Sequence, residues 1–134
     1  MTIKQKLWNT FSRYIRMRDA DESGYCECIS CPKTLHWKEM DAGHFIPKSR
    51  GTYFYFNEDN VHAQCPACNR FGSMDTGYRY GEKLKMKIGV DMVKELESKS
   101  KSRPIMKLSK IQMNEIDKKY KLSIKQLQEF KNLD

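Results

Sequence analysis

Hydrophobic residues recur with a helical period near the start of the chain. Leu7, Phe11, Tyr14, Ile15 and Arg18 fall on one face of a helix, and this face is mostly apolar. Lysine and arginine residues occupy the other faces. The turn-forming run at residues 21–24 then ends the pattern. The sequence therefore predicts an amphipathic helix over residues 3–18 with a basic exterior.

The middle of the chain has short apolar runs separated by turn signals. Residues 34–45 suit a short hairpin or strand that ends near His44, and residues 46–51 form a loop with two positive charges. The aromatic run at residues 53–56 is typical of a strand, and residues 61–64 can pair briefly. Pro66 is well placed to open a helix, because a first-turn residue needs no N–H donor.

The last third of the chain, from about Tyr78, is predicted to form helices that are separated by Gly89 and by a linker at residues 98–104. One helical pattern continues to Tyr120, and a second begins at the N-cap candidate Ser123. Both patterns have apolar faces that need a partner surface.

Composition favours one folded domain and an anionic partner. The chain has 134 residues, of which 39% are hydrophobic, and 25 Lys and Arg outweigh 17 Asp and Glu to give a net charge of +8. Nucleic acid is the first candidate partner, although a merely soluble basic protein remains open. No stretch approaches the roughly 20 apolar residues of a membrane span, and the start lacks the apolar segment of a secretory signal. We therefore expect a cytoplasmic protein with no membrane partner.

Two Cys-x-x-Cys pairs, Cys28/Cys31 and Cys65/Cys68, indicate a structural zinc site. Zinc prefers four tetrahedral ligands, and each pair can offer two thiolates from one tight turn. Free or disulfide-bonded cysteines are the alternative, which a reducing compartment disfavours. Cys26 could replace one ligand, but a packed thiol is the more ordinary expectation. With four cysteines available, His36 and His62 are expected to be structural.

Between the cysteine pairs lies a pattern of one His and two Asn residues. A His closes a strand, an Asn sits in the middle of a loop, and a second Asn begins a helix. These residues are His44, Asn60 and Asn69. This order resembles the HNH, or ββα-metal, nuclease motif. Further matching segments are residues 16–21, 24–26, 28–31, 38–45 and 78–79. They resemble the phage lambda NinG (Rap) family of recombination endonucleases, over about residues 7–125.

The resemblance implies a metal-dependent endonuclease that acts on branched DNA intermediates such as D-loops and Holliday junctions. It implies that His44 is the general base, that Asn69 contributes an oxygen to Mg²⁺ or Mn²⁺, and that Asn60 tethers the loop. A neutral imidazole can take a proton at pH 7, and hard cations prefer oxygen ligands. Asn69 could instead only cap a helix, and Asn60 could only hold a turn.

One position departs from the motif, because many HNH proteins have an acidic residue directly before the His and this chain has Gly43. The nearest acid is Asp41, which on a regular strand faces away from His44. A β-bulge at Gly43 would restore a common face. We therefore expect Asp41 to join Asn69 on the catalytic metal, the alternative being an ion pair with Lys38 or Lys48.

Basic residues close in sequence to this segment are candidates for phosphate contacts: Lys48, Arg50, Arg70 and Arg79. Each could also be ordinary solvated surface. The aromatic run at residues 53–56 could stack on unpaired bases, but alternate core positions of a strand are the simpler interpretation.

The expected fold is α+β, with a zinc-stabilised ββα-metal (HNH, His-Me finger) core. We expect an N-terminal amphipathic helix at 1–24, a nuclease core at 25–80 and a helical C-terminal extension at 81–134, all in one compact domain. Two other functions stay open: a non-catalytic zinc-containing DNA-binding module, and an HNH nickase without branch selectivity. Symmetric cutting of a junction would favour a homodimer, while the apolar C-terminal helices could equally pack within one chain.

Overall fold

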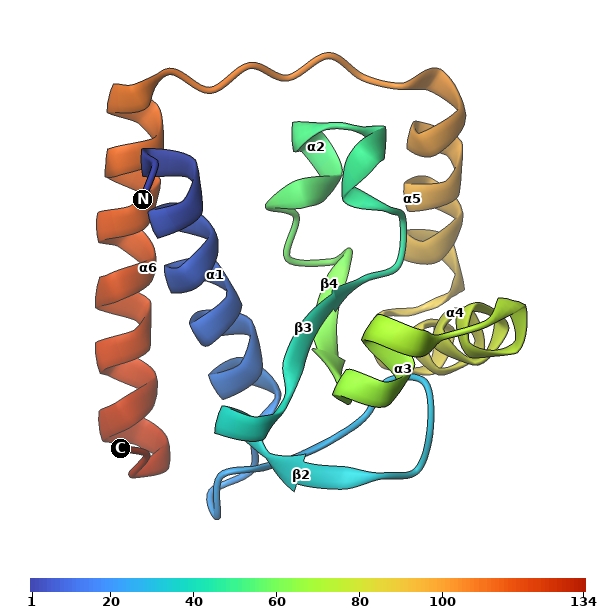
Figure 1. Ribbon diagram of the computed structural model, residues 1–134, viewed down its shortest axis with the longest axis horizontal. Helices are drawn as coiled ribbons and strands as arrows, with labels where there is room; N and C mark the ends of the chain where they lie inside the picture. The colour runs from blue at the N-terminus through green and yellow to red at the C-terminus, as the bar shows by residue number, and fades with distance from the viewer.

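A computed structural model describes all residues, 1–134, as an α+β fold that is mostly helical and has two small antiparallel sheets (Figure 1). The helices are α1 (Ile3–Asp19), α2 (Thr52–Tyr55), α3 (Pro66–Phe71), α4 (Met74–Ile88), α5 (Val90–Ser102) and α6 (Lys110–Lys131). The strands are β1 (Tyr25–Glu27), β2 (Thr34–His36), β3 (Asp41–His44) and β4 (Val61–Gln64), and 3-10 turns occur at η1 (Trp37–Glu39) and η2 (Lys48–Arg50).

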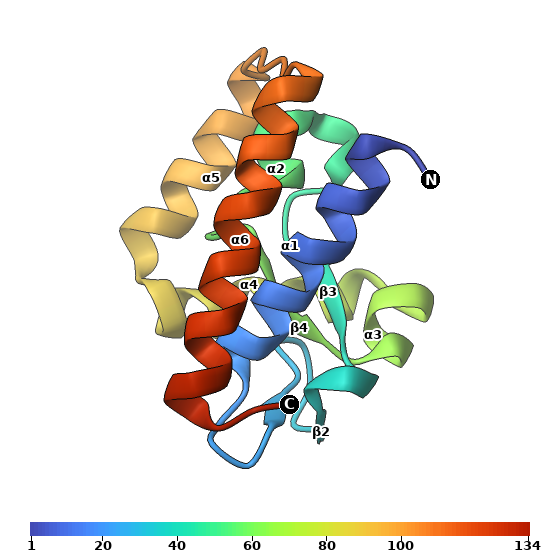
Figure 2. The same cartoon turned by 90° about the vertical axis from the view of Figure 1, so that its left-hand side faces the viewer.

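Helix α1 confirms the N-terminal prediction. Thr2 and Gln5 form a capping box at its start, which satisfies backbone N–H groups that have no partner within the helix. The predicted apolar face is the buried one: Leu7, Phe11 and Ile15 are fully buried. This face packs against α6 on one side and against β3 and β4 on the other, and Figure 2 shows α1 and α6 side by side.

The centre of the molecule is the hairpin of β3 and β4, followed directly by α3. The two strands pair without interruption, from Asp41 opposite Gln64 to His44 opposite Val61. Pro66 is the first residue of α3, as predicted, and the short helix lies beside β3 (Figure 1). A second hairpin, β1 and β2, lies at the base of the molecule and flanks the first cysteine pair.

The aromatic run at residues 53–56 was expected to be a strand, and this prediction is wrong. It forms the short helix α2, which begins after Gly51, a residue with φ of +124° that favours glycine. Only Phe54 of this run is fully buried. Strand propensity needs a neighbouring strand to pair with. In the structure this run pairs with no strand, since the two small sheets contain only β1 with β2 and β3 with β4.

The C-terminal third is helical as predicted, but its boundaries differ. Helix α5 continues to Ser102, so the connection is residues 103–109 rather than 98–104, and it crosses the top of the molecule to α6 (Figure 1). Helix α6 is continuous: Ser123 lies in its interior and its hydroxyl donates to the Lys119 carbonyl. Ile116, Tyr120 and Ile124 form one uninterrupted stripe against the core, so no second helix start is needed.

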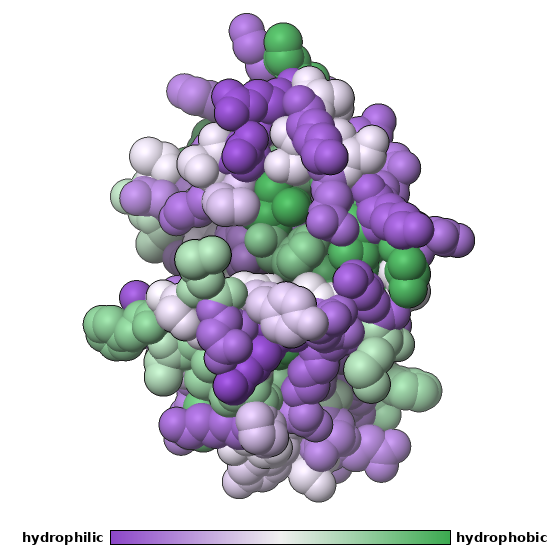
Figure 3. Space-filling model, turned by 90° about the vertical axis from the view of Figure 1, so that its right-hand side faces the viewer, coloured by the Kyte–Doolittle hydropathy of each residue, from purple (hydrophilic) through white to green (hydrophobic).

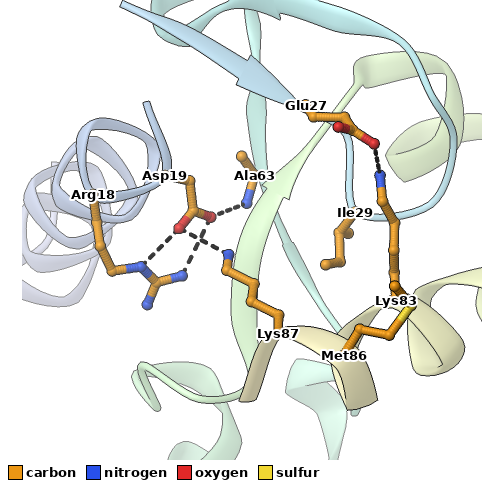
Figure 4. A pocket seen from close by; sticks show the side chains of 8 residues that line it. All are labelled: Arg18, Asp19, Glu27, Ile29, Ala63, Lys83, Met86 and Lys87. Atoms are coloured by element: carbon orange, nitrogen blue, oxygen red, sulfur yellow. Dashed lines mark hydrogen bonds and ion pairs between the residues drawn. The ribbon is translucent and has the colours of Figure 1, made fainter. Parts of the chain in front are cut away.

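The end of α1 is tied to β4 and α4 by the partly buried carboxylate of Asp19 (Figure 4). Asp19 accepts from the Ala63 backbone N–H at 2.8 Å and pairs with Arg18 and Lys87, both at 2.9 Å. Although burial alone would raise it, these partners hold the pKa of Asp19 at about 2. The residues border a pocket of about 460 Å³. Its cations are all paired to acids or to carbonyls, so we regard it as structural.

The face presented by α4 and α5 is mostly hydrophilic, with hydrophobic residues gathered at its middle (Figure 3). Val93 and Leu96 of α5 are buried beneath this face together with Tyr80 and Leu84 of α4. No helix in the molecule combines the length and apolar character needed to span a bilayer.

Candidate functional site

The four predicted cysteines come together at the base of the molecule. The Sγ atoms of Cys28, Cys31, Cys65 and Cys68 all lie within 4.8 Å of one another, and the Cys31 and Cys65 sulfurs are 3.8 Å apart. In a zinc tetrathiolate with bonds of about 2.3 Å, neighbouring sulfurs are about 3.8 Å apart. The Cys28 sulfur also accepts backbone N–H groups from Ser30 and Cys65. The residues therefore fit a closed structural zinc site.

The remaining cysteine and two of the histidines lie outside this cluster, as expected. The Cys26 thiol is buried and donates to the Arg16 carbonyl at 3.2 Å, and burial raises its pKa to about 12. His36 caps η1 by accepting from the Lys38 N–H. His62 lies in the interior between β4 and α4, where burial and nearby cations lower its pKa to about 4. At pH 7 this ring is therefore neutral.

His44 is the last residue of β3 and lies in an aromatic setting. Its ring stacks on Trp8 of α1, with centroids 5.1 Å apart, and its Nε2 lies 3.0 Å from the Tyr55 carbonyl oxygen. A carbonyl only accepts hydrogen bonds, so Nε2 carries the proton of the neutral ring and Nδ1 keeps a free lone pair. Burial, with a smaller effect of Lys48, lowers the pKa of His44, which keeps the ring neutral at pH 7.

Asn60 holds the loop that faces His44. It is fully buried, accepts from the Ile46 N–H at 2.8 Å, and donates to the carbonyls of Ile46 at 2.9 Å and Phe54 at 3.0 Å. These bonds join both ends of the segment between β3 and α2, so they also fix the neighbouring Tyr55 carbonyl. Asn60 thus orients His44 through the backbone and touches no part of the His44 ring.

Asp41 and Asn69 lie together, at the other end of β3 from His44. The Asn69 amide donates to the Asp41 carboxylate at 3.0 Å, and the guanidinium of Arg70 donates to both carboxylate oxygens at 3.0 and 2.9 Å. The proximity expected for Asp41 and Asn69 is present. Asp41 pairs with Arg70, however, rather than with Lys38 or Lys48.

The bulge expected at Gly43 is absent, and that prediction is wrong. Regular pairing places Asp41 and His44 on opposite faces of β3, about 10 Å apart along the strand. Gly43 has a different role, because a Cβ built on it would lie 1.9 Å from Oε1 of Gln64. That side chain crosses over Gly43 and donates to the Ser30 hydroxyl at 2.9 Å. The missing acid therefore leaves room for a buried link between β4 and the first cysteine pair.

Replacing Gly43 by alanine is expected to destabilise the fold by about 1–3 kcal/mol, the usual cost of overpacking a buried site. Gln64 would have to leave its buried bond to Ser30. Urea unfolding monitored by circular dichroism measures the change. Gly77→Ala is the matched control, since nothing lies within 4 Å of its Cβ position in α4, and it should be neutral or stabilising. Equal stability of the two variants would contradict this packing role.

The predicted phosphate contacts differ in their surroundings. Lys48 lies over the Tyr55 ring at 5.6 Å, close enough to His44 to lower its pKa, and forms no ion pair. Arg50, at the end of η2, also forms no ion pair. Arg79 pairs with Asp75 at 2.9 Å on the exposed surface of α4. Together with the pairing of Arg70, this leaves two of the four cations unneutralised.

Two groups that contact His44 were not among the residues predicted from the sequence. Tyr55 acts through its backbone carbonyl, which no residue pattern can signal. Trp8 lies beside the apolar stripe of α1 rather than within it, and a large aromatic residue at that flanking position was the available signal.

Comparison with known proteins connects these residues to one family. A family model described as "Bacteriophage Lambda NinG protein" matches residues 2–130. Protein ninG of Escherichia phage lambda is 39% identical over 85 residues, which are 63% of this chain and 39% of that protein. Protein ninG of Salmonella phage P22 is 38% identical over 88 residues, 66% of this chain and 40% of that protein. The chain thus spans about two fifths of these relatives. No solved structure matches.

Proposed function

The chain belongs to the bacteriophage lambda NinG family, and on that premise we propose that it is a metal-dependent endonuclease. Its substrates are phosphodiester bonds in branched DNA recombination intermediates such as D-loops and Holliday junctions. The observation that carries the proposal is the neutral His44 ring, which is oriented by the Tyr55 carbonyl at the end of β3.

The proposed core is a ββα-metal unit made of β3, β4 and α3. Three features support it: the uninterrupted hairpin, the helix that begins directly after β4, and the cysteine cluster that joins both ends of the segment. Zinc at Cys28, Cys31, Cys65 and Cys68 would frame this unit and take no part in the reaction.

His44 is the proposed general base. Its Nδ1 accepts a proton from the attacking water, while Nε2 keeps its own proton in the bond to Tyr55. The water oxygen forms a bond to phosphorus, the P–O3′ bond breaks, and the leaving oxygen takes up a proton. The products are a 5′-phosphate and a 3′-hydroxyl. General-base help of this kind is typically worth about 10²–10⁴ in rate.

Asp41 and Asn69 are the proposed ligands of Mg²⁺ or Mn²⁺. A carboxylate and an amide oxygen suit a hard cation, and the two side chains already touch. Such an ion would supply charge stabilisation for the phosphate and the leaving oxygen. Both oxygens of the Asp41 carboxylate accept hydrogen bonds from Arg70. Binding of the cation therefore requires Arg70 to break at least one of these two bonds. Because Asp41 lies on the opposite face of β3 from His44, action on the phosphate that His44 serves also requires Asp41 to change position.

The experiment that tests this function compares four DNA substrates of matched sequence: a four-way junction, a three-way junction, a linear duplex and a single strand. We expect cleavage of the junctions with Mg²⁺, loss of cleavage with EDTA, and little cleavage of the linear duplex. Zinc content is measured after EDTA treatment, so that loss of the catalytic ion is distinguished from loss of the structural one.

Two outcomes would contradict the proposal. Equal rates on the linear duplex and on junctions would remove the branched-DNA selectivity and leave a general nickase. Junction binding without cleavage under any metal condition would favour the non-catalytic zinc-containing module.

A further inference from the structure

Three cations surround one buried indole beside the proposed site. Trp37 of η1 is 4% exposed, and its ring lies 5.6 Å from the charged group of Arg13, 5.5 Å from that of Arg16 and 5.6 Å from that of Lys38. Cation–π attraction holds charged groups at such distances from an aromatic face. Helix α1 supplies two of these positive charges, and η1 brings Lys38, which is distant in the sequence, to the same ring.

None of the three cations is neutralised by an acid. The ion pairs of the chain use other cations: Arg18, Arg70, Arg79, Lys83, Lys85, Lys87 and Lys121. Glu39, the one acid of η1, pairs with none of them. Arg16 donates from Nε to Ser12 and from Nη1 to the Trp37 carbonyl, which leaves Nη2 without an acceptor. Like charges held this close repel one another, so the arrangement favours an anion.

Two of the three cations, Arg16 and Lys38, border a pocket that reaches the proposed metal ligands. The pocket has a volume of about 310 Å³ and is lined by residues of α1, η1, β3 and α3. Its lining includes Ser12, Arg16, Lys38, Asp41 and Asn69. The one acid there, Asp41, is already paired with Arg70, so the pocket keeps its positive charge.

We propose that Arg13, Arg16 and Lys38, gathered around Trp37, bind a backbone phosphate of the DNA substrate. The inference rests on the proposed function and adds a specific contact to it. The pocket that holds this phosphate also contains Asp41 and Asn69, so the bound phosphate lies beside the proposed metal ligands.

The test measures DNA affinity as a function of salt, with zinc-loaded protein and no added Mg²⁺. Lys38→Gln and Arg13→Gln each remove one cation from an exposed side chain and leave the bond from Arg16 to Trp37 intact. Lys94→Gln, on the exposed side of α5, is the matched control. Fluorescence anisotropy with a labelled four-way junction gives the dissociation constant at each salt concentration.

We expect Lys38→Gln and Arg13→Gln each to reduce the magnitude of the slope of log affinity against log salt by up to about 0.9, the value for one phosphate contact, because the three cations share one phosphate. The full value corresponds to about fivefold weaker binding near physiological salt. Lys94→Gln should match the parent protein. Unchanged slopes in both pocket variants would overturn the inference.

Two further readouts separate the inference from the function on which it rests. Junction cleavage by the parent together with unchanged slopes refutes the phosphate site and leaves the nuclease proposal standing. Lower slopes with no cleavage by the parent support the phosphate site and refute the nuclease.

Tryptophan fluorescence distinguishes the source of the phosphate, because Trp8 lines this pocket and the Trp37 ring contacts the cations that border it. A saturable change with inorganic phosphate, without any change in the DNA slopes, would assign the pocket to a free anion and overturn the DNA assignment.

Discussion

His44→Ala is expected to abolish detectable junction cleavage while the protein keeps its zinc and its affinity for the junction. The His44 ring, which the Tyr55 carbonyl orients, supplies the nitrogen that accepts the proton of the attacking water. Loss of a general base typically lowers the rate about 10²–10⁴-fold. Single-turnover cleavage with Mg²⁺ measures the effect. Zinc content and anisotropy binding are measured on the same preparation.

His36→Ala is the matched control for His44→Ala. It also removes an imidazole, but from the start of η1, where the ring caps a backbone N–H and packs against Tyr25 and Trp37, away from His44. It should cleave at a rate close to that of the parent. A His44→Ala protein that retains parental activity would refute the role of His44, and the nuclease proposal would lose its central residue.

The variant Asn60→Ala would act on the same base indirectly. Asn60 is a positioning residue, because it fixes the loop whose Tyr55 carbonyl orients the ring. This route explains why the middle residue of the motif is fully buried rather than exposed to substrate.

Cys65→Ser is expected to have the largest effect on stability, with loss of zinc and unfolding of the region around β4 and α3. Binding of a structural zinc contributes about 10–16 kcal/mol in zinc-finger peptides, which exceeds the stability of most domains. Cys65 is buried, and its backbone N–H also donates to the Cys28 sulfur. Inductively coupled plasma mass spectrometry gives the zinc content, and thermal melting by circular dichroism gives the stability.

Cys26→Ala is the control for the cysteine substitution. The Cys26 thiol is buried next to the cluster but bonds to the Arg16 carbonyl, so this variant should keep full zinc and lose only a small part of its stability. A Cys65→Ser protein with one zinc per chain and a parental melting temperature would show that the four cysteines are not the binding site.

The regular pairing of β3 changes how the departure from the nuclease motif is understood. A bulge at Gly43 was expected because the acid that many HNH proteins have beside the His is absent. Instead, the side chain of Gln64 occupies the space where a Cβ at Gly43 would lie. Asp41 still reaches Asn69, but from the opposite face to His44 and through a network that includes Arg70.

Several features followed from local patterns in the sequence. The apolar period of residues 3–18 specified α1, because a helix buries one stripe of side chains whatever packs against it. The spacing of Cys28, Cys31, Cys65 and Cys68 indicated their cluster, because each pair offers two sulfurs from one turn. Pro66 marked the start of α3 for a similarly local reason.

Only the tertiary structure decided the rest, because those features depend on partners distant in the chain. Residues 53–56 became a helix because no strand lies beside them, and Ser123 stayed inside α6 because the stripe against α1 continues past it. The contacts of His44 with Trp8 and Tyr55, and the gathering of Arg13, Arg16 and Lys38 around Trp37, join separate elements. The sequence determined which residues could do chemistry here, and packing determined which of them meet.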